Sequence, residues 1–183
     1  QDPTVAANPN LMHPFTATQI TQKGIEHLAE YARVIRDQLG NTIPIAIDHF
    51  GHIGLDSCIR LGRALDRFTF AWYEDMLPWQ FPKQMKAIKD AVETPVCTGE
   101  DIYLRQEFKT LLDEDCVSYV HPDLATSGGI LETKRIGDLA QEYGVPMVLH
   151  QAGSPIVAMA NVHCAAATEN FVALEMHSVD LPW

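Results

Sequence analysis

Six acidic or imidazole side chains recur along this chain at intervals of 23 to 27 residues. They are Asp48, Glu74, Glu100, Asp123, His150 and Glu175. Most of them close a short apolar run, as in the segments IPIAID, FAWYE and VPMVLH. A strand and its return helix take about 25 to 35 residues when eight such units share about 250 residues. The spacing therefore predicts one reactive side chain at the carboxyl end of each of several parallel strands, where barrel enzymes place their active sites.

Three of the six are carboxylates that end consecutive predicted strands, namely Asp48, Glu74 and Glu100. At the mouth of a barrel these three would converge on one point. Hard oxygen ligands without a Cys or an obvious His partner favour Mg²⁺, with Mn²⁺ as the second choice, over Zn²⁺. For any one of them the alternative is a helix cap or an ion pair with an Arg on the rim. The occurrence of all three in register favours a metal site.

Asp123 and His150 end neighbouring predicted strands and could form a hydrogen bond. A carboxylate bound to one imidazole nitrogen fixes the tautomer and leaves the other nitrogen to act as a base. A proton next to a carboxylate is very weakly acidic, so such a base needs a metal that stabilises the charge developing on the substrate. The alternative is a histidine that is merely hydrogen-bonded at a helix start.

Helices and strands are predicted to alternate after residues 1–16, a Pro- and Asn-rich loop. The first helix spans Thr18 to about Gln38, with Gly40 as its C-cap. Predicted strands cover residues 43–48, 69–74, 95–100, 117–120, 146–150 and 172–175. Predicted helices cover residues 55–66, 82–92, 105–115, 130–144 and 156–169. The helix at 55–66 is expected to open near Asp56 or Ser57, and Ser127 is a candidate N-cap for the helix at 130–144.

The predicted strands are apolar throughout, which indicates a parallel sheet covered by helices. A doubly wound open sheet and a closed (β/α)8 barrel both fit. The absence of a GxGxxG turn argues against a dinucleotide-binding sheet, and polar residues at nearly every strand end favour the barrel. Six strand–helix units are too few to close a barrel, and an open piece would expose two strand edges. We therefore interpret residues 43–48 as the third strand of a barrel that belongs to a longer polypeptide.

Composition excludes some classes of partner. The formal net charge of −11 argues against binding a nucleic acid, and no apolar run reaches the roughly 18 residues of a membrane span. The four cysteines lie far apart without a CxxC pair, which indicates reduced, buried thiols in a cytoplasmic protein. No signal peptide is visible, and because the chain begins at Gln1, the natural N-terminus is expected to be missing.

The segments DHFGH, WYED, TGED, HPDLATSGGI, VLHQ and ALE, in this order and at these intervals, resemble the enolase superfamily. Within it they resemble the acid-sugar dehydratase branch of the mandelate racemase and muconate-lactonizing enzyme family. The resemblance covers about residues 18–180 and implies strands three to eight of a modified (β/α)8 barrel. It divides the chain into a loop at 1–16 and a partial barrel domain at 17–183, with the N-terminal capping domain of the family absent.

The resemblance also implies a role for each of the six side chains. Asp48, Glu74 and Glu100 would bind Mg²⁺, or Mn²⁺ in its place. His150 would be the base and Asp123 its orienting partner. Glu175 would hydrogen-bond the substrate carboxylate or the enolate oxygen, and the alternative is a carboxylate on the barrel rim without a role in the reaction.

One position departs from the family pattern. Several acid-sugar dehydratases carry a His two residues after the first metal-binding Asp, where it protonates the leaving hydroxyl, and this chain has Phe50 there. His49 and His52 on either side are candidate substrate-binding residues that could substitute for it. His177, shortly after Glu175, is a further candidate for lining the pocket.

Lysine placement separates the reactions of the family. The lysines lie on predicted helices, and none ends a strand. A racemase needs a base on each face of the reacting carbon, whereas a dehydratase can use a single base. We therefore expect a Mg²⁺-dependent hydro-lyase that converts a sugar acid to a 2-keto-3-deoxy acid and acts as a homo-oligomer. The alternatives are a racemase, epimerase or cycloisomerase of the same family, and a non-catalytic barrel remnant that binds no metal. These 183 residues alone should show little turnover.

Overall fold

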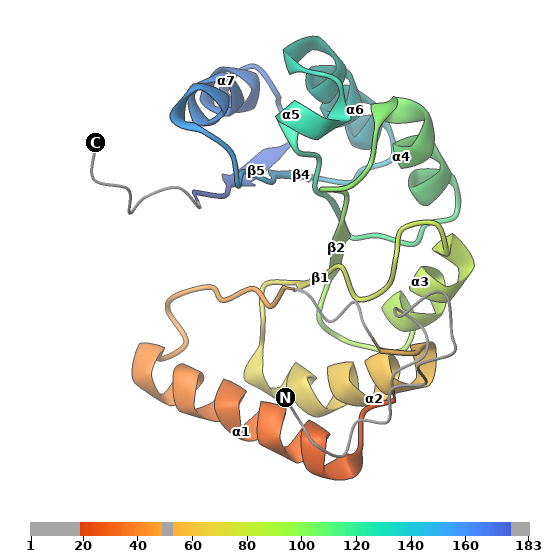
Figure 1. Ribbon diagram of the computed structural model, residues 1–183, viewed down its shortest axis with the longest axis vertical. Coiled ribbons are helices and arrows are strands. Elements are labelled where there is room, and N and C mark those ends of the chain that lie inside the picture. Colours follow the sequence, from red (N-terminus) through yellow and green to blue (C-terminus); the bar gives the residue numbers. More distant parts are fainter. Residues whose placement is uncertain (1–18, 49–52, 177–183) are drawn as a thin grey trace. The chain divides into compact units, whose positions relative to one another are not determined.

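A computed structural model describes residues 19–48 and 53–176 of the chain (Figure 1). The chain divides into two compact units, Gln1–Val96 and Cys97–Trp183. Across the described residues, no helix combines the length and the apolar character that crossing a bilayer requires.

The first unit contains mostly helix. Its elements are α1 (Gln22–Leu39), α2 (Leu55–Leu65), the short 3₁₀ helix η2 (Asp66–Phe68), β1 (Tyr73–Glu74) and α3 (Pro82–Lys89). Helix α1 begins after Thr21, whose side chain accepts a hydrogen bond from the Gly24 N–H. It ends at Gly40, which has a φ of 66° and donates its N–H to the Arg36 carbonyl. Gly40 is therefore the C-cap, as the sequence predicts.

Two expectations for this unit need correction. In place of the strand expected at 43–48, the structure has one parallel bridge, between Ile47 and Tyr73. Main-chain hydrogen bonds still join Ile45 and Ile47 to the segment around β1. Helix α2 begins at Leu55, where the predicted range 55–66 also begins, but its N-cap is Gly54 and not Asp56 or Ser57. The Ser57 hydroxyl is engaged elsewhere, since it accepts a hydrogen bond from the Ile20 N–H and donates one to Gln19 Oε1.

The second unit carries the regular alternation of strand and helix. Its elements are β2 (Val96–Thr98), which begins at the last residue of the first unit, α4 (Leu104–Asp113), β3 (Tyr119–Val120), α5 (Leu124–Ser127), α6 (Ile130–Glu142), β4 (Met147–Leu149), α7 (Pro155–Ala166) and β5 (Phe171–Leu174). Strands β2, β3, β4 and β5 pair in this order, and every pairing is parallel. Helices α4, α6 and α7 lie along one side of these strands (Figure 1). The parallel α/β arrangement predicted from the apolar strands is confirmed.

The core of this unit lies between the strands and the helices. Helix α6 packs against both α4 and α7. Phe108 and Leu111 of α4, Ile136 of α6, and Met147 and Leu149 of β4 are fully buried. Because whole strands are buried, their sequences are continuously apolar and not alternating.

Helix α5 is a short turn that the sequence did not predict. Ser127 ends this turn and does not cap the following helix, whose N-cap is Gly129 at a φ of 85°. The Ser127 hydroxyl hydrogen-bonds the Thr133 hydroxyl at 2.8 Å, which ties the turn to the first residues of α6.

Candidate active site

Four of the six predicted side chains follow the strands of the second unit. Glu100 comes two residues after β2, Asp123 three after β3, and His150 and Glu175 directly after β4 and β5. Hydrogen bonding continues beyond the strands, because the His150 N–H donates to the Pro122 carbonyl and the Glu175 N–H donates to the Leu149 carbonyl. The carboxyl ends of parallel strands meet at one edge of a sheet, so these side chains lie together.

His150 is at the centre of this group. Its Nδ1 lies 2.7 Å from Asp123 Oδ2. On the other side of the ring, Nε2 lies 3.1 Å from Glu100 Oε2 and 3.5 Å from Glu175 Oε2. One imidazole therefore contacts three carboxylates, and all four side chains are partly or largely buried. We call Glu100, Asp123, His150 and Glu175 the His150 cluster.

Asp123 is fixed by the main chain as well as by His150. It is the N-cap of α5, where its Oδ1 accepts hydrogen bonds from the Ala125 and Thr126 N–H groups. Burial opposes ionisation, but the hydrogen bonds from His150 and from these amides outweigh it and lower the pKa of Asp123. A carboxylate at Oδ2 requires a proton on Nδ1 of His150, and this leaves Nε2 as the nitrogen that exchanges a proton with a substrate.

The carboxylates also control the charge of His150. Burial favours the neutral ring, but the hydrogen bond to Asp123 and the charges of Glu100, Glu175 and Asp123 outweigh burial and raise the pKa of His150 to about 9. Without a bound cation, the ring therefore carries a proton at neutral pH. The raised pKa also means that the neutral ring, once it has lost this proton, is a stronger base than ordinary imidazole. Removing a proton from a weakly acidic carbon–hydrogen bond requires such a base.

Gln151 holds the segment that follows β4. Its side chain is fully buried, and its amide donates to the carbonyls of Gly153 and Ser154 just before α7. Its backbone N–H donates to Glu175 Oε2 at 3.2 Å. Glu175 is thus anchored between a main-chain amide and the His150 ring.

His121 belongs to this site although the sequence analysis did not select it. It follows β3 directly, is 1% exposed, and places Nδ1 3.2 Å from the Val148 carbonyl oxygen. Its ring contacts the His150 ring edge to face, with 5.4 Å between centroids and 83° between planes. Its position two residues before Asp123, at the end of an apolar run, was a signal that could have identified it.

Gly99 allows the end of β2 to approach His121. A Cβ at Gly99 would lie 2.7 Å from Phe108 Cε1 and 2.9 Å from the His121 carbonyl carbon. Its φ of 151° is also one that other residues rarely adopt. Glycine at this position is therefore required for the chain to carry Glu100 past β3.

The first unit holds the other two predicted metal ligands. Glu74 is the last residue of β1, is 6% exposed, and accepts a hydrogen bond from Trp72 Nε1 at 2.9 Å. Asp48 is exposed and follows Ile47, the residue that bridges to β1. Within the first unit, Glu74 thus ends a strand and Asp48 follows the residue that pairs with that strand. His49, His52 and His177 lie outside the described residues.

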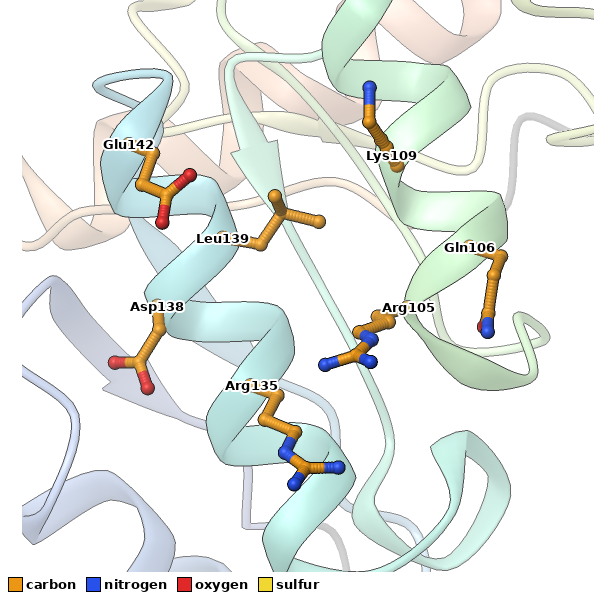
Figure 2. Close-up of a pocket in the computed structure, with 7 residues that line it drawn as sticks. All are labelled: Arg105, Gln106, Lys109, Arg135, Asp138, Leu139 and Glu142. Carbon is orange, nitrogen blue, oxygen red and sulfur yellow. The ribbon is translucent and has the colours of Figure 1, made fainter.

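A separate groove of about 330 Å³ lies between α4 and α6 (Figure 2). Its lining residues are Arg105, Gln106, Lys109, Arg135, Asp138, Leu139 and Glu142. Glu132 Oε1 and Oε2 each lie 3.8 Å from a guanidinium nitrogen, of Arg105 and Arg135 respectively, and Lys109 is paired with Asp113 at 2.6 Å. Leu139 points between the two helices. No member of the His150 cluster lines this groove, which we call the α4–α6 groove.

The sequence profile of the family described as enolase C-terminal domain-like matches residues 7–183. The chain belongs to this family. The partial barrel predicted from the sequence is thus confirmed as a portion of the enolase-type C-terminal barrel, and the α/β alternation of the second unit is the part of it described above.

Known relatives agree with this family. The chain is 35% identical to a D-xylonate dehydratase of Haloferax volcanii over 87% of its own length and 39% of that protein. A mandelate racemase/muconate lactonizing enzyme-like protein from Rubrobacter xylanophilus matches with a TM-score of 0.86 and 34% identity, over 89% of this chain and 41% of that one. A structure described as a putative galactarate dehydratase from Agrobacterium radiobacter, with bound Na and L-malate, matches with a TM-score of 0.80 and 32% identity, over 84% and 39%. The chain therefore spans about two fifths of the length of these relatives.

Proposed function

We propose that the whole protein containing these residues is a hydro-lyase that removes water from a sugar acid and yields a 2-keto-3-deoxy acid. The observation that carries the proposal is the arrangement of His150, whose Nδ1 meets Asp123 while Nε2 faces Glu100 and Glu175. The names of the relatives support the substrate class, since they include dehydratases of D-xylonate, arabinonate, and D-gluconate or D-galactonate.

In this proposal, His150 acts as the base. Nε2 takes the proton from the carbon next to the substrate carboxylate, and the electron pair of that C–H bond forms a C–C double bond as the neighbouring hydroxyl leaves. Asp123 keeps the proton on Nδ1 and stabilises the imidazolium that forms. The departing hydroxyl takes up one proton and becomes water, and the remaining enol rearranges to the keto acid. His150 can supply that proton, and His49 and His52 are the other candidates.

Glu175 is proposed to bind the substrate. Its carboxyl group lies beside Nε2 and is anchored by the Gln151 N–H, so it is placed to hydrogen-bond an oxygen of the group from which the proton leaves. An oriented donor or acceptor at this point favours the transition state because charge develops there.

Asp48, Glu74 and Glu100 are proposed to bind Mg²⁺. The donor set fits this ion, because all three side chains are carboxylates and Mg²⁺ prefers oxygen ligands over nitrogen or sulfur. Glu100 is partly buried beside His150 and Glu74 is buried in the first unit, and a buried carboxylate is stabilised by a bound cation. When bound, the ion would draw the negative charge that develops on the substrate carboxylate.

The activity is tested by incubating the whole protein and Mg²⁺ with a panel of aldonic and aldaric acids that includes D-xylonate, arabinonate, gluconate and galactonate. We expect a 2-keto acid, detected as its semicarbazone, from at least one of them. A product that is an epimer of the substrate, without loss of water, would indicate the isomerase alternative. No turnover of any member would contradict the proposal.

The metal site is tested separately by thermal unfolding. Adding Mg²⁺ at about 100 times its dissociation constant should raise the melting temperature by a few degrees, because ligand binding to the folded state stabilises it by about 2.7 kcal/mol. Glu100→Gln should lose most of this rise. Glu132→Gln is the matched control, because it removes a carboxylate from α6 in the same unit but should keep the full rise.

A further inference from the structure

His121 has no role in the reaction proposed above, although it contacts the residue at the centre of it. Its ring is almost completely buried and lies edge to face with His150. Main-chain carbonyls of the two neighbouring strands hold this residue. The backbone N–H of His121 donates to the Thr98 carbonyl, and its ring Nδ1 lies 3.2 Å from the Val148 carbonyl oxygen. A carbonyl oxygen can only accept, so Nδ1 carries the proton.

A base of this kind needs two restraints. The hydrogen bond from Nδ1 to Asp123 and the contacts of Nε2 with Glu100 and Glu175 hold the His150 ring at its edge, but they do not support its faces. The torsion about the Cβ–Cγ bond of a histidine is broad, so the ring plane can tilt about this bond unless a neighbouring group packs against it. Such a tilt would move Nε2 out of line with Glu100 and Glu175, where the proposed reaction needs it.

The ring of His121 supplies the second restraint. With the two planes at 83° and the centroids 5.4 Å apart, one ring edge abuts the other ring face. Edge-to-face pairs of aromatic rings are favoured at this separation. Because hydrogen bonds to Thr98 and Val148 hold His121 in place, its ring provides a fixed surface against which the His150 ring packs.

We propose that His121 is a positioning residue that holds the imidazole plane of His150, so that Nε2 stays directed at Glu100 and Glu175. The inference rests on the proposed function for its catalytic consequence, but the restraint itself is a property of the two rings. The ring shape of His121 is what matters, and its hydrogen bond to Val148 serves to hold that ring in place.

Two variants of the whole protein distinguish the effect of the His121 ring from the effect of its hydrogen bond to the Val148 carbonyl. His121→Phe keeps a planar ring against His150 and loses the donor to the Val148 carbonyl. His121→Gln keeps an amide donor for that carbonyl and loses the ring. We expect kcat of His121→Phe within about threefold of the unsubstituted protein and kcat of His121→Gln lower by about tenfold or more, with KM changed by less than about twofold in both. Equal kcat in the unsubstituted protein and His121→Gln would overturn the proposal. So would losses of kcat that only follow the melting temperature of each variant.

A second measurement does not depend on turnover. In protein labelled with ¹³C at histidine, the ring signals of His150 are identified as those missing from His150→Gln. We expect one sharp set of His150 ring signals in the unsubstituted protein and in His121→Phe, and broadened or shifted signals in His121→Gln as the ring plane tilts. One unchanged set in His121→Gln would overturn the proposal. If no sugar acid reacts but the signals behave as expected, the proposed function fails while the positioning role stands.

Discussion

Charged side chains gather in two regions of the second unit, the His150 cluster and the α4–α6 groove. In the groove, exposed cations lie beside acids, with Arg105 and Arg135 near Glu132 and Lys109 paired with Asp113. In the cluster, three carboxylates share one imidazole, and Asp123 is largely buried.

The two regions differ in how their charges affect the stability of the folded protein. Exposed ion pairs contribute about 0–1 kcal/mol and are common on helices without any function. An excess of like charge in a partly buried place is unfavourable for stability, so its presence indicates a function that requires it. The groove is therefore the less informative region, and chemistry is expected where the charges are unbalanced.

The largest effect should come from His150→Gln in the cluster. Removing the base should lower kcat by about 10³-fold or more, because general base catalysis contributes about 10²–10⁴-fold and the C–H bond is weakly acidic. Arg135→Gln in the α4–α6 groove is the matched control and should leave kcat unchanged. The measurement is the initial rate of 2-keto acid formation. Comparable losses in the two variants would remove the distinction between the regions.

Asp123→Asn should lower kcat by about 100-fold with little change in KM, because an amide no longer fixes the proton on Nδ1 of His150. Asn is as good an N-cap as Asp, so the melting temperature should fall only slightly. Asp123→Ala should lose a similar amount of activity and in addition about 1 kcal/mol of stability with the cap. Steady-state kinetics and thermal unfolding of both variants check this, and full activity of Asp123→Asn would contradict it.

The pH dependence of stability should differ between the regions in the absence of metal. The folded protein raises the pKa of His150 from 6.5 to about 9, so the imidazolium stabilises the fold fully below pH 6.5. This contribution declines as the pH rises and is lost above about pH 9. For Asp123, whose pKa is lowered from 3.8, stability is present above that value and is lost as the pH falls below it.

Melting temperatures measured in EDTA between pH 6 and pH 10 test the histidine. The unsubstituted protein should lose stability over this range, and His150→Gln should lose less. Arg135→Gln in the α4–α6 groove should behave like the unsubstituted protein. A decline of the same size in His150→Gln would show that the loss comes from other groups.

The smallest effect is expected at Glu132, the acidic partner of the arginines that line the α4–α6 groove. Glu132→Gln should lower the free energy of unfolding by less than about 1 kcal/mol, because its two guanidinium partners lie 3.8 Å away and are about half exposed. The hydrogen bond from the Arg105 N–H to Glu132 can be kept by the amide oxygen. Denaturant unfolding measures the difference, and a loss of activity in this variant would show that the groove is coupled to the cluster.

The sequence predicted the strand ends well because their signal is local. An apolar run of four to six residues that closes with Glu100, His150 or Glu175 indicates both a buried strand and a polar end, and parallel pairing then brings the ends together. The meeting of Asp123 and His150 follows from the same rule. It needs no knowledge of side-chain conformation beyond the order of the strands.

The features that sequence could not supply depend on competing hydrogen bonds. Ser57 and Ser127 have the residue type of an N-cap, but each binds another side chain, and Gly54 and Gly129 take the cap positions. His121 was missed because a histidine at a strand end is ordinarily a core or surface residue, and its contact with His150 arises from packing between strands. Nothing in the local pattern near Asp123 indicated that it would also begin a helical turn.

The double use of Asp123 has a consequence for which substitutions the turn can tolerate. If the Asp123 carboxylate turned away from His150, it would lose its hydrogen bonds from the Ala125 and Thr126 amides. The capping of α5 therefore fixes the side-chain torsion of Asp123. Those two amides exist whatever side chains the positions bear. Evolution is therefore free to vary residues 125 and 126 for shape or solubility without disturbing the proton on the histidine, with proline, which has no amide hydrogen, as the exception.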